Sequence, residues 1–175
     1  ELTLEGGEVV IDLGAGAGID SFLVSQMLIS GMVISIDMTE EMLALHRPET
    51  PGVPIKLVTG DLERLPIGDC TADIVIANAA FNLTINKATA YKEAFRILKP
   101  GGKLINWDLV LGGDLPREVL EDPLAHETSL GGVVEENTMR TALEAAGFIE
   151  IEISNYSQYS FVVAALITAR RDSTL

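Results

Sequence analysis

The sequence contains little cysteine, histidine or basic charge. Its 175 residues include one cysteine (Cys70), two histidines, and 12 basic against 26 acidic side chains, which gives a net charge of −14. A single cysteine excludes an internal disulfide and a cysteine-based zinc site, and two distant histidines predict no other metal centre. The acidic excess, without a cluster of Lys and Arg, argues against a nucleic-acid partner and against an anionic membrane surface.

Long apolar stretches are also missing. The longest apolar run, residues 161–169, is far shorter than the roughly 20 residues of a bilayer-spanning helix, and no signal peptide is evident. Hydrophobic residues nevertheless make up 47% of the chain and charged residues 22%, which excludes disorder of the whole chain. We expect a folded protein without membrane attachment, working in a reducing compartment such as the cytoplasm.

Apolar runs alternate with helical patterns along most of the chain. The runs that predict buried strands are residues 9–13, 33–37, 55–59, 73–77 and 103–109. The predicted helices are residues 19–30, with Gly31 as their stop, a helix that begins at Thr39 and ends before Pro48, and residues 88–98 and 135–146. This alternation predicts an α/β fold with a mainly parallel sheet covered on both faces. Residues 149–154 and 161–169 have no helix between them and should pair as an antiparallel hairpin.

The length fits a single domain over residues 1–175, and the regular pattern breaks only once. Between residues 110 and 134, two Gly-Gly pairs and two prolines interrupt the alternation. We expect an insertion or lid over about residues 110–134.

A glycine-rich loop, residues 12–18 with the sequence DLGAGAG, separates the first predicted strand from the first predicted helix. Glycines here allow unusual backbone angles, close approach of a ligand and close packing of the helix, although a simple tight turn is the alternative. The dinucleotide fingerprint requires a glycine at position 19, which is Ile19. Asp12 at the start of the loop would repel a diphosphate and attract a cationic ligand.

Two more carboxylates follow at strand ends. Asp37 is placed to accept hydrogen bonds from both ribose hydroxyls of a nucleoside, and Asp61 from an adenine amino group. Met38 could cover a purine face. The alternatives are a solvated strand end for Asp37, an ordinary turn for Asp61 and core packing for Met38. Together the three carboxylates predict a site for an adenosine that carries positive charge rather than phosphate, which describes S-adenosylmethionine.

These motifs resemble the class I S-adenosylmethionine-dependent methyltransferases. The loop 12–18 is similar to their first motif. The segment that enters their fourth strand is similar to residues 65–69 (LPIGD) together with 72–75 (ADIV), and the entry of their fifth strand is similar to residues 94–102 (AFRILKPGG). The resemblance implies a Rossmann-like, doubly wound, seven-stranded sheet in the order 3-2-1-4-5-7-6 with the last strand antiparallel. It also implies S-adenosylmethionine contacts, which we assign to Asp12, Gly14, Ala15, Gly16, Asp37, Met38, Asp61, Leu62 and Asn78.

Within this class the sequence is most similar to the arsenite-methyltransferase-like branch. The similar segments are residues 36–39 with 41–43, residues 78–83 (NAAFNL), residues 122–124 and residues 130–132. Arsenic chemistry in that branch relies on cysteine thiolates, whereas this chain has Ala79 and Ser129 at two of those places. A lone thiol cannot chelate trivalent arsenic. We therefore expect a small-molecule methyltransferase without arsenite activity.

Methyl transfer from a sulfonium mainly requires alignment of the nucleophile, the methyl carbon and the sulfur. Where the acceptor needs a general base, the candidates are Asp108, after the fifth predicted strand, and His126, in the expected lid. Asn78, Asn82 and Trp107 are further candidates for the site's rim. Two other functions stay open: a domain that binds the cofactor or its product S-adenosylhomocysteine without catalysis, and a nicotinamide-dependent oxidoreductase.

Overall fold

The computed structural model describes residues 4, 6–46, 52–112, 132–159 and 162–174. Its elements, in chain order, are β1 (Glu8–Leu13), α1 (Ile19–Met27), β2 (Gly31–Asp37), α2 (Glu40–Leu43), β3 (Ile55–Thr59), β4 (Ala72–Asn78), the 3-10 turn η1 (Phe81–Leu83), α3 (Lys87–Ile97), β5 (Leu98–Leu111), β6 (Val134–Glu135), α5 (Glu136–Ala146), β7 (Ile149–Tyr159) and β8 (Val162–Arg170). No helix in these described ranges is long and apolar enough to cross a bilayer.

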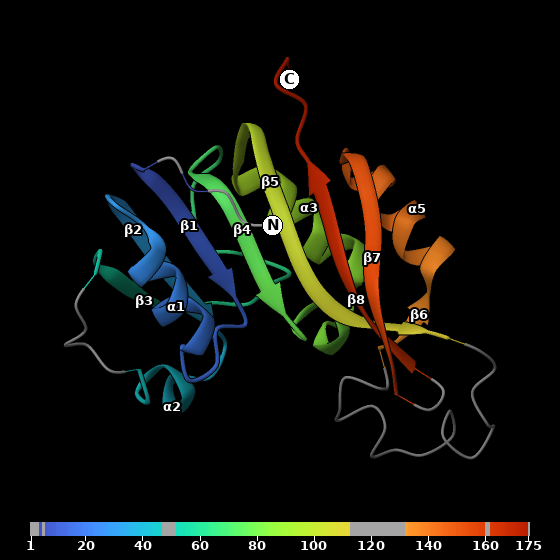
Figure 1. Ribbon diagram of the computed structural model, residues 1–175, viewed down its shortest axis with the longest axis horizontal. Helices are drawn as coiled ribbons and strands as arrows, with labels where there is room; N and C mark the ends of the chain where they lie inside the picture. The colour runs from blue at the N-terminus through green and yellow to red at the C-terminus, as the bar shows by residue number, and fades with distance from the viewer. Residues whose placement is uncertain (1–3, 5, 47–51, 113–131, 160–161, 175) are drawn as a thin grey trace.

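The strands form one twisted sheet in the order β3-β2-β1-β4-β5-β8-β7 (Figure 1). β3, β2, β1, β4 and β5 are parallel to one another, and β8 pairs antiparallel with both β5 and β7. The predicted order 3-2-1-4-5-7-6 is therefore confirmed, with β7 and β8 as its sixth and seventh strands. The sequence did not predict β6, whose two residues pair with the end of β5. The rest of the expected insertion, residues 113–131, lies outside the described residues.

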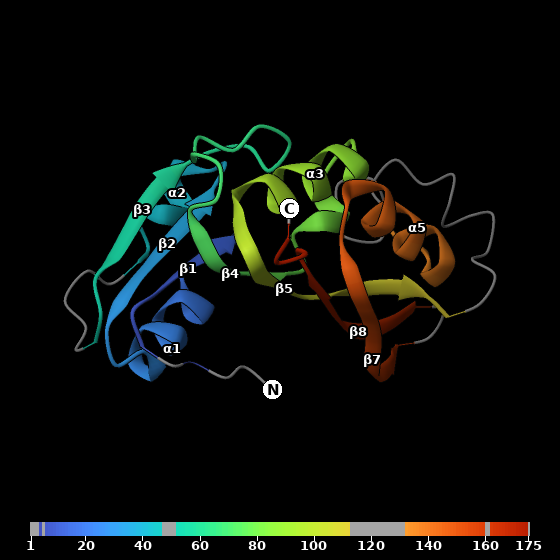
Figure 2. The ribbon, with the colours of Figure 1, turned by 90° about the horizontal axis from the view of Figure 1, so that it is seen from above.

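Helices cover the sheet on both faces (Figure 2). α1 lies on one face, where Val24 and Leu28 pack against Val10 and Val33. α3 and α5 lie on the other face and contribute the larger core. β1 is buried on both sides because its alternate residues point into the two cores, as is usual for a central parallel strand.

Two glycines act differently from the prediction. The first helix ends at Met27, so Gly31 is not its stop; it opens β2 with φ +109°, and a Cβ there would overlap the carbonyl oxygen of Glu8. Gly101, expected with its neighbours to end a helix before the fifth strand, lies within β5. Gly147 does end α5 in a left-handed conformation, as predicted.

Candidate active site

The carboxyl ends of β1, β2 and β4 open onto a cavity of about 470 Å³. Such a position, beyond the ends of parallel strands where the strand order reverses, is the usual ligand site of an open α/β sheet. The lining residues are Gly14, Gly16, Asp37, Met38, Thr39, Met42, Asp61, Leu62, Glu63, Asn78, Ala79, Ala80, Leu83, Thr84 and Ile85. Seven of the nine residues assigned from the sequence to the cofactor therefore lie together around one cavity, although they come from four separate segments of the chain.

The glycine loop is held against the sheet by its own backbone. The N–H groups of Gly14 and Ala15 both donate to the carbonyl oxygen of Ile36, at 2.8 and 3.0 Å. Gly14 has φ +70°, and a Cβ there would lie 2.5 Å from the Cβ of Ala80 across the cavity wall. Both the backbone angle and the narrow gap require glycine at this position.

Asp37 is the best-defined polar group of the cavity. Its Oδ2 accepts a hydrogen bond from the N–H of Gly16 at 2.9 Å, and its Oδ1 accepts one from the N–H of Thr39 at 2.9 Å. A carboxylate oxygen can accept two hydrogen bonds, so each oxygen keeps capacity for a ligand hydroxyl. The two backbone hydrogen bonds thus fix the position of the carboxylate and leave part of its acceptor capacity unused.

The cavity lining also combines a second carboxylate with apolar side chains. The Oδ1 of Asp61 accepts from the N–H of Glu63 at 2.9 Å, which closes a short turn after β3. Met38 is 74% exposed and so does not pack in the core, and Leu83 and Ile85 are exposed and also line the cavity. These apolar groups are suited to the faces of a flat ring, and the carboxylate to an amino group on its edge.

Asp12 and Ala15 are not among the lining residues. Asp12 is only 2% exposed and lies behind the loop, where Ser21 Oγ donates to its Oδ2 and a further contact of 2.6 Å joins the hydroxyls of Ser21 and Ser35. Burial raises the pKa of Asp12 to about 6, and the bond from Ser21 opposes that rise. In this position Asp12 ties β1 to α1 and β2.

Asn78, at the end of β4, lies between two hollows. Its Nδ2 donates to Asp20 Oδ2 at 3.0 Å. Asn78 and Asp20 line a second, more open depression of about 270 Å³, together with Leu23, Ile105 and Trp107. The sequence analysis missed Asp20. The sequence feature that could have indicated Asp20 is its place as an acidic residue in the first turn of the helix that follows the glycine loop.

Asp108, the predicted base, is not among the lining residues of the cavity. It is 1% exposed and accepts hydrogen bonds from the N–H groups of Leu109 and Asn82, at 2.9 and 3.2 Å. Burial raises its pKa to about 6, while these bonds and the charge of Lys87 act in the opposite direction. Lys87 donates to the carbonyl oxygen of Phe81 and to Asn82 Oδ1, at 2.8 and 3.0 Å, so Asp108 belongs to a buried group that braces η1 against β5.

The other predicted base, His126, and Ser129 lie outside the described residues. Among the described residues, no group of three His, Cys, Asp or Glu side chains is placed to hold a metal ion.

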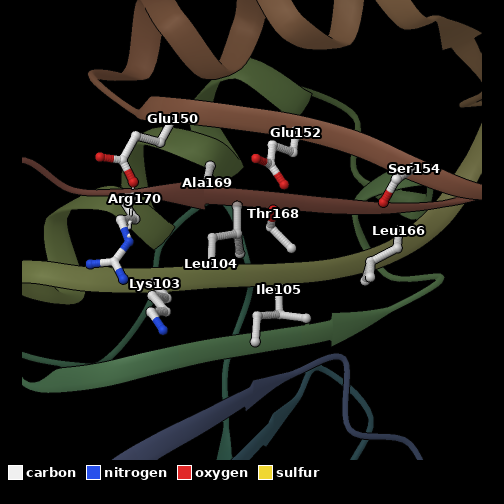
Figure 3. A pocket seen from close by; sticks show the side chains of 10 residues that line it. All are labelled: Lys103, Leu104, Ile105, Glu150, Glu152, Ser154, Leu166, Thr168, Ala169 and Arg170. Carbon is white, nitrogen blue, oxygen red and sulfur yellow. Dashed lines mark ion pairs between the residues drawn. The ribbon is translucent and has the colours of Figure 1, made fainter. Parts of the chain in front are cut away.

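A larger hollow of about 530 Å³ lies on the face of β5, β8 and β7 (Figure 3). Its charged groups are Lys103, Arg170, Glu150 and Glu152, and Arg170 Nε lies 3.3 Å from Glu150 Oε2. None of the residues assigned to a site from the sequence lines it. The smaller cavity beside the glycine loop is therefore the better candidate.

A family model described as a methyltransferase domain matches residues 4–147. The chain belongs to this family. The chain is a class I S-adenosylmethionine-dependent methyltransferase of the arsenite-methyltransferase-like branch, so the resemblance noted in the sequence motifs is confirmed.

Curated relatives include several arsenite methyltransferases. The chain is 33% identical over 152 residues to the enzyme of Halobacterium salinarum, covering 85% of this chain and 39% of the relative. It is 30% identical over 168 residues to that of Aquipseudomonas alcaligenes, covering 90% and 49%. The chain thus spans less than half the length of these two relatives.

Solved structures share the fold. An arsenic(III) S-adenosylmethionine methyltransferase from Chlamydomonas reinhardtii aligns with a TM-score of 0.76 at 25% identity, over 95% of this chain and 64% of that one. A phosphoethanolamine N-methyltransferase from Haemonchus contortus, in complex with S-adenosylmethionine, aligns with a TM-score of 0.83 at 15% identity, over 97% and 50%.

Proposed function

We propose that this chain is the catalytic domain of a methyltransferase that transfers a methyl group from S-adenosylmethionine to a small-molecule acceptor. The observation that carries the proposal is the charge of the cavity. Three acidic residues, Asp37, Asp61 and Glu63, stand in its described lining, and no lysine or arginine does. A dinucleotide would bring a pyrophosphate to a wall without a cation, whereas a sulfonium nucleoside would bring positive charge to an acidic one.

The residues present fit such a ligand. Asp37 would accept hydrogen bonds from the ribose hydroxyls, because both of its oxygens keep free acceptor capacity. Asp61 would accept from the adenine amino group, with Met38 and Leu62 against the ring. Gly14 and Gly16 would leave room for the rest of the nucleoside.

S-adenosylmethionine, when bound, supplies an already activated methyl group on a positively charged sulfur. The chain's own part is then to hold the nucleoside and to orient the acceptor in line, which can contribute roughly 7–11 kcal/mol. The side chains of Leu83 and Ile85 make part of the lining apolar, and a weakly polar site favours a reaction in which charge is lost. Asp108 and His126 remain predictions as bases; the burial of Asp108 behind η1 favours a bracing role for it.

We infer that the acceptor is not trivalent arsenic, although several relatives are arsenite methyltransferases. Arsenic(III) requires several soft sulfur ligands. The 175-residue sequence has only Cys70, which is exposed and does not line the cavity, and the cavity wall has Ala79 at a place where the resemblance implies a thiol. The same single thiol agrees with our assignment of the protein to the cytoplasm.

One alternative is a domain that binds the nucleoside without catalysis. It is favoured by the described cavity lining, which contains no thiol and no histidine to act on an acceptor.

Calorimetry followed by turnover assays tests the proposal. We expect S-adenosylmethionine and S-adenosylhomocysteine to bind and NADH not to bind, whereas the oxidoreductase hypothesis predicts the reverse. S-adenosylhomocysteine should then accumulate with at least one of a panel of phenols, quinone precursors, amines and thiols, and stay at background with arsenite. Binding without turnover across the panel would favour the non-catalytic alternative.

A further inference from the structure

The glycine loop is contacted from behind by a histidine to which the sequence assigned no role in the site. His46, three residues beyond α2, is 9% exposed, and its Nε2 lies 3.0 Å from the carbonyl oxygen of Gly16. A carbonyl oxygen can only accept, so Nε2 carries the hydrogen and the ring donates. The sequence had suggested only a helix-end residue favoured by the helix dipole.

The ring also fills the space beside Gly18, the residue that precedes α1. Gly18 has φ +83°, and a Cβ there would overlap the imidazole atoms Cε1, Nδ1 and Cγ. Glycine is thus required at position 18 both by the backbone angle and by the histidine packed against it. His46 and the loop fit together as one unit.

The peptide groups around Gly16 are therefore held from two directions. The Gly16 N–H donates to Asp37 Oδ2 at 2.9 Å on the cavity side, and its carbonyl oxygen accepts from His46. A displacement of Gly16 away from His46 would also move its N–H relative to Asp37. The position of the Asp37 carboxylate, the group assigned to the ribose, is thus coupled to His46.

We propose that His46 is a positioning residue for the nucleoside: it holds the glycine loop, and through Gly16 the Asp37 carboxylate, in the binding conformation. The identity of the nucleoside rests on the function proposed above, but the effect of His46 on the glycine loop does not. His46 does not line the cavity, so it acts on affinity for the nucleoside and not on the methyl transfer itself.

The test compares variants with and without the donor. His46→Phe keeps a ring beside Gly18 and loses the N–H, His46→Leu is a second variant without a donor in case the phenyl ring does not fit, and His46→Gln places a nitrogen donor the same number of bonds from the backbone. Leu45→Ala, at an exposed neighbour, is the control for changes near the end of α2. The measurements are S-adenosylhomocysteine affinity by calorimetry, amide hydrogen exchange at Gly16 in the free protein by NMR, and the Michaelis constant for S-adenosylmethionine against kcat.

The proposal expects the Phe and Leu variants to bind S-adenosylhomocysteine about tenfold more weakly, the effect of losing one hydrogen bond worth about 1.4 kcal/mol. Gly16 should exchange faster in both variants, kcat at saturating cofactor should not change, and the Gln variant should recover most of the affinity. Wild-type affinity and exchange in the Phe and Leu variants would overturn it, as would a Gln variant no better than Phe. If the wild-type protein binds no S-adenosylhomocysteine, the proposed function fails, and the exchange rates at Gly16 still decide the role of His46.

Discussion

Replacement of Asp12 by asparagine provides a sharp test of how the site is built, because Asp12 carries a carboxyl group into the space between β1, β2 and α1. Its surroundings hold the hydroxyl groups of Ser21 and Ser35, and the charges that shift its pKa among the described residues are the acidic ones of Asp20 and Asp37. An asparagine at this position would keep the shape and an oxygen to accept from Ser21. It would lack the group that ionises.

The magnitude follows from the pKa. Burial raises the pKa of Asp12 from its ordinary value of 3.8 to about 6, so between these two values the folded chain retains a proton that the unfolded chain has released. Stability from this group is therefore fully present below about pH 3.8 and is lost as the pH rises through 6. The loss corresponds to roughly 3 kcal/mol of unfolding free energy.

Urea unfolding, followed by the fluorescence of Trp107, the single tryptophan, measures this slope between pH 4 and 7.5. The readout is the difference between the variant and the wild type, since it cancels carboxylates such as Glu93, whose pKa is lowered and whose effect has the opposite sign. We expect the Asp12→Asn variant to lose less stability than the wild type as the pH rises. Asp69→Asn, at an exposed carboxylate paired with Arg96, is the control and should leave the slope almost unchanged. A wild-type slope in the Asp12→Asn variant would refute the argument.

Three further predictions concern the cavity and its supports. Asp37→Ala should weaken S-adenosylhomocysteine binding by roughly 10- to 100-fold in calorimetry, because hydrogen bonds to a charged group are lost; unchanged affinity would remove its role at the ribose. Gly14→Ala should lower the melting temperature more than Gly16→Ala, since a Cβ would lie 2.5 Å from Ala80 in the first case and 3.5 Å from Met42 Cε in the second; equal shifts would contradict this reasoning. Lys87→Met should destabilise the fold by about 1–3 kcal/mol in urea unfolding, because two acceptors in η1 lose their donor, whereas Lys92→Met, at an exposed position of α3, should have almost no effect; equal losses would exclude the bracing role.

Much of the fold follows from residue patterns. Buried parallel strands are apolar on both faces and helices on one, so the alternation along the chain predicted every strand of the main sheet. β6 was missed because its two residues carry no periodicity. Gly31 was misassigned because the sequence does not show that β1 passes too close for a side chain.

The site was predictable to a similar degree. Residues at strand ends converge on one edge of a parallel sheet, so Asp37, Asp61 and Asn78 could be placed together from sequence alone. Asp12 lies deeper in the sheet than Asp37: it precedes the last residue of β1 and pairs with Ser35 and Ile76, whereas Asp37 is the last residue of β2. In the β1–β2 register Asp12 lies two residues before the position of Asp37, so its carboxylate is buried against α1, whereas that of Asp37 lines the cavity. His46 was out of reach because its contact with Gly16 spans 30 residues.

A crystal structure of the protein soaked with S-adenosylhomocysteine tests the central claim most directly. We predict the nucleoside in the 470 Å³ cavity, with its ribose hydroxyls on Asp37 and its adenine between Met38 and Leu62. An empty cavity at saturating ligand, or the nucleoside bound instead in the hollow of β5, β7 and β8, would contradict the account.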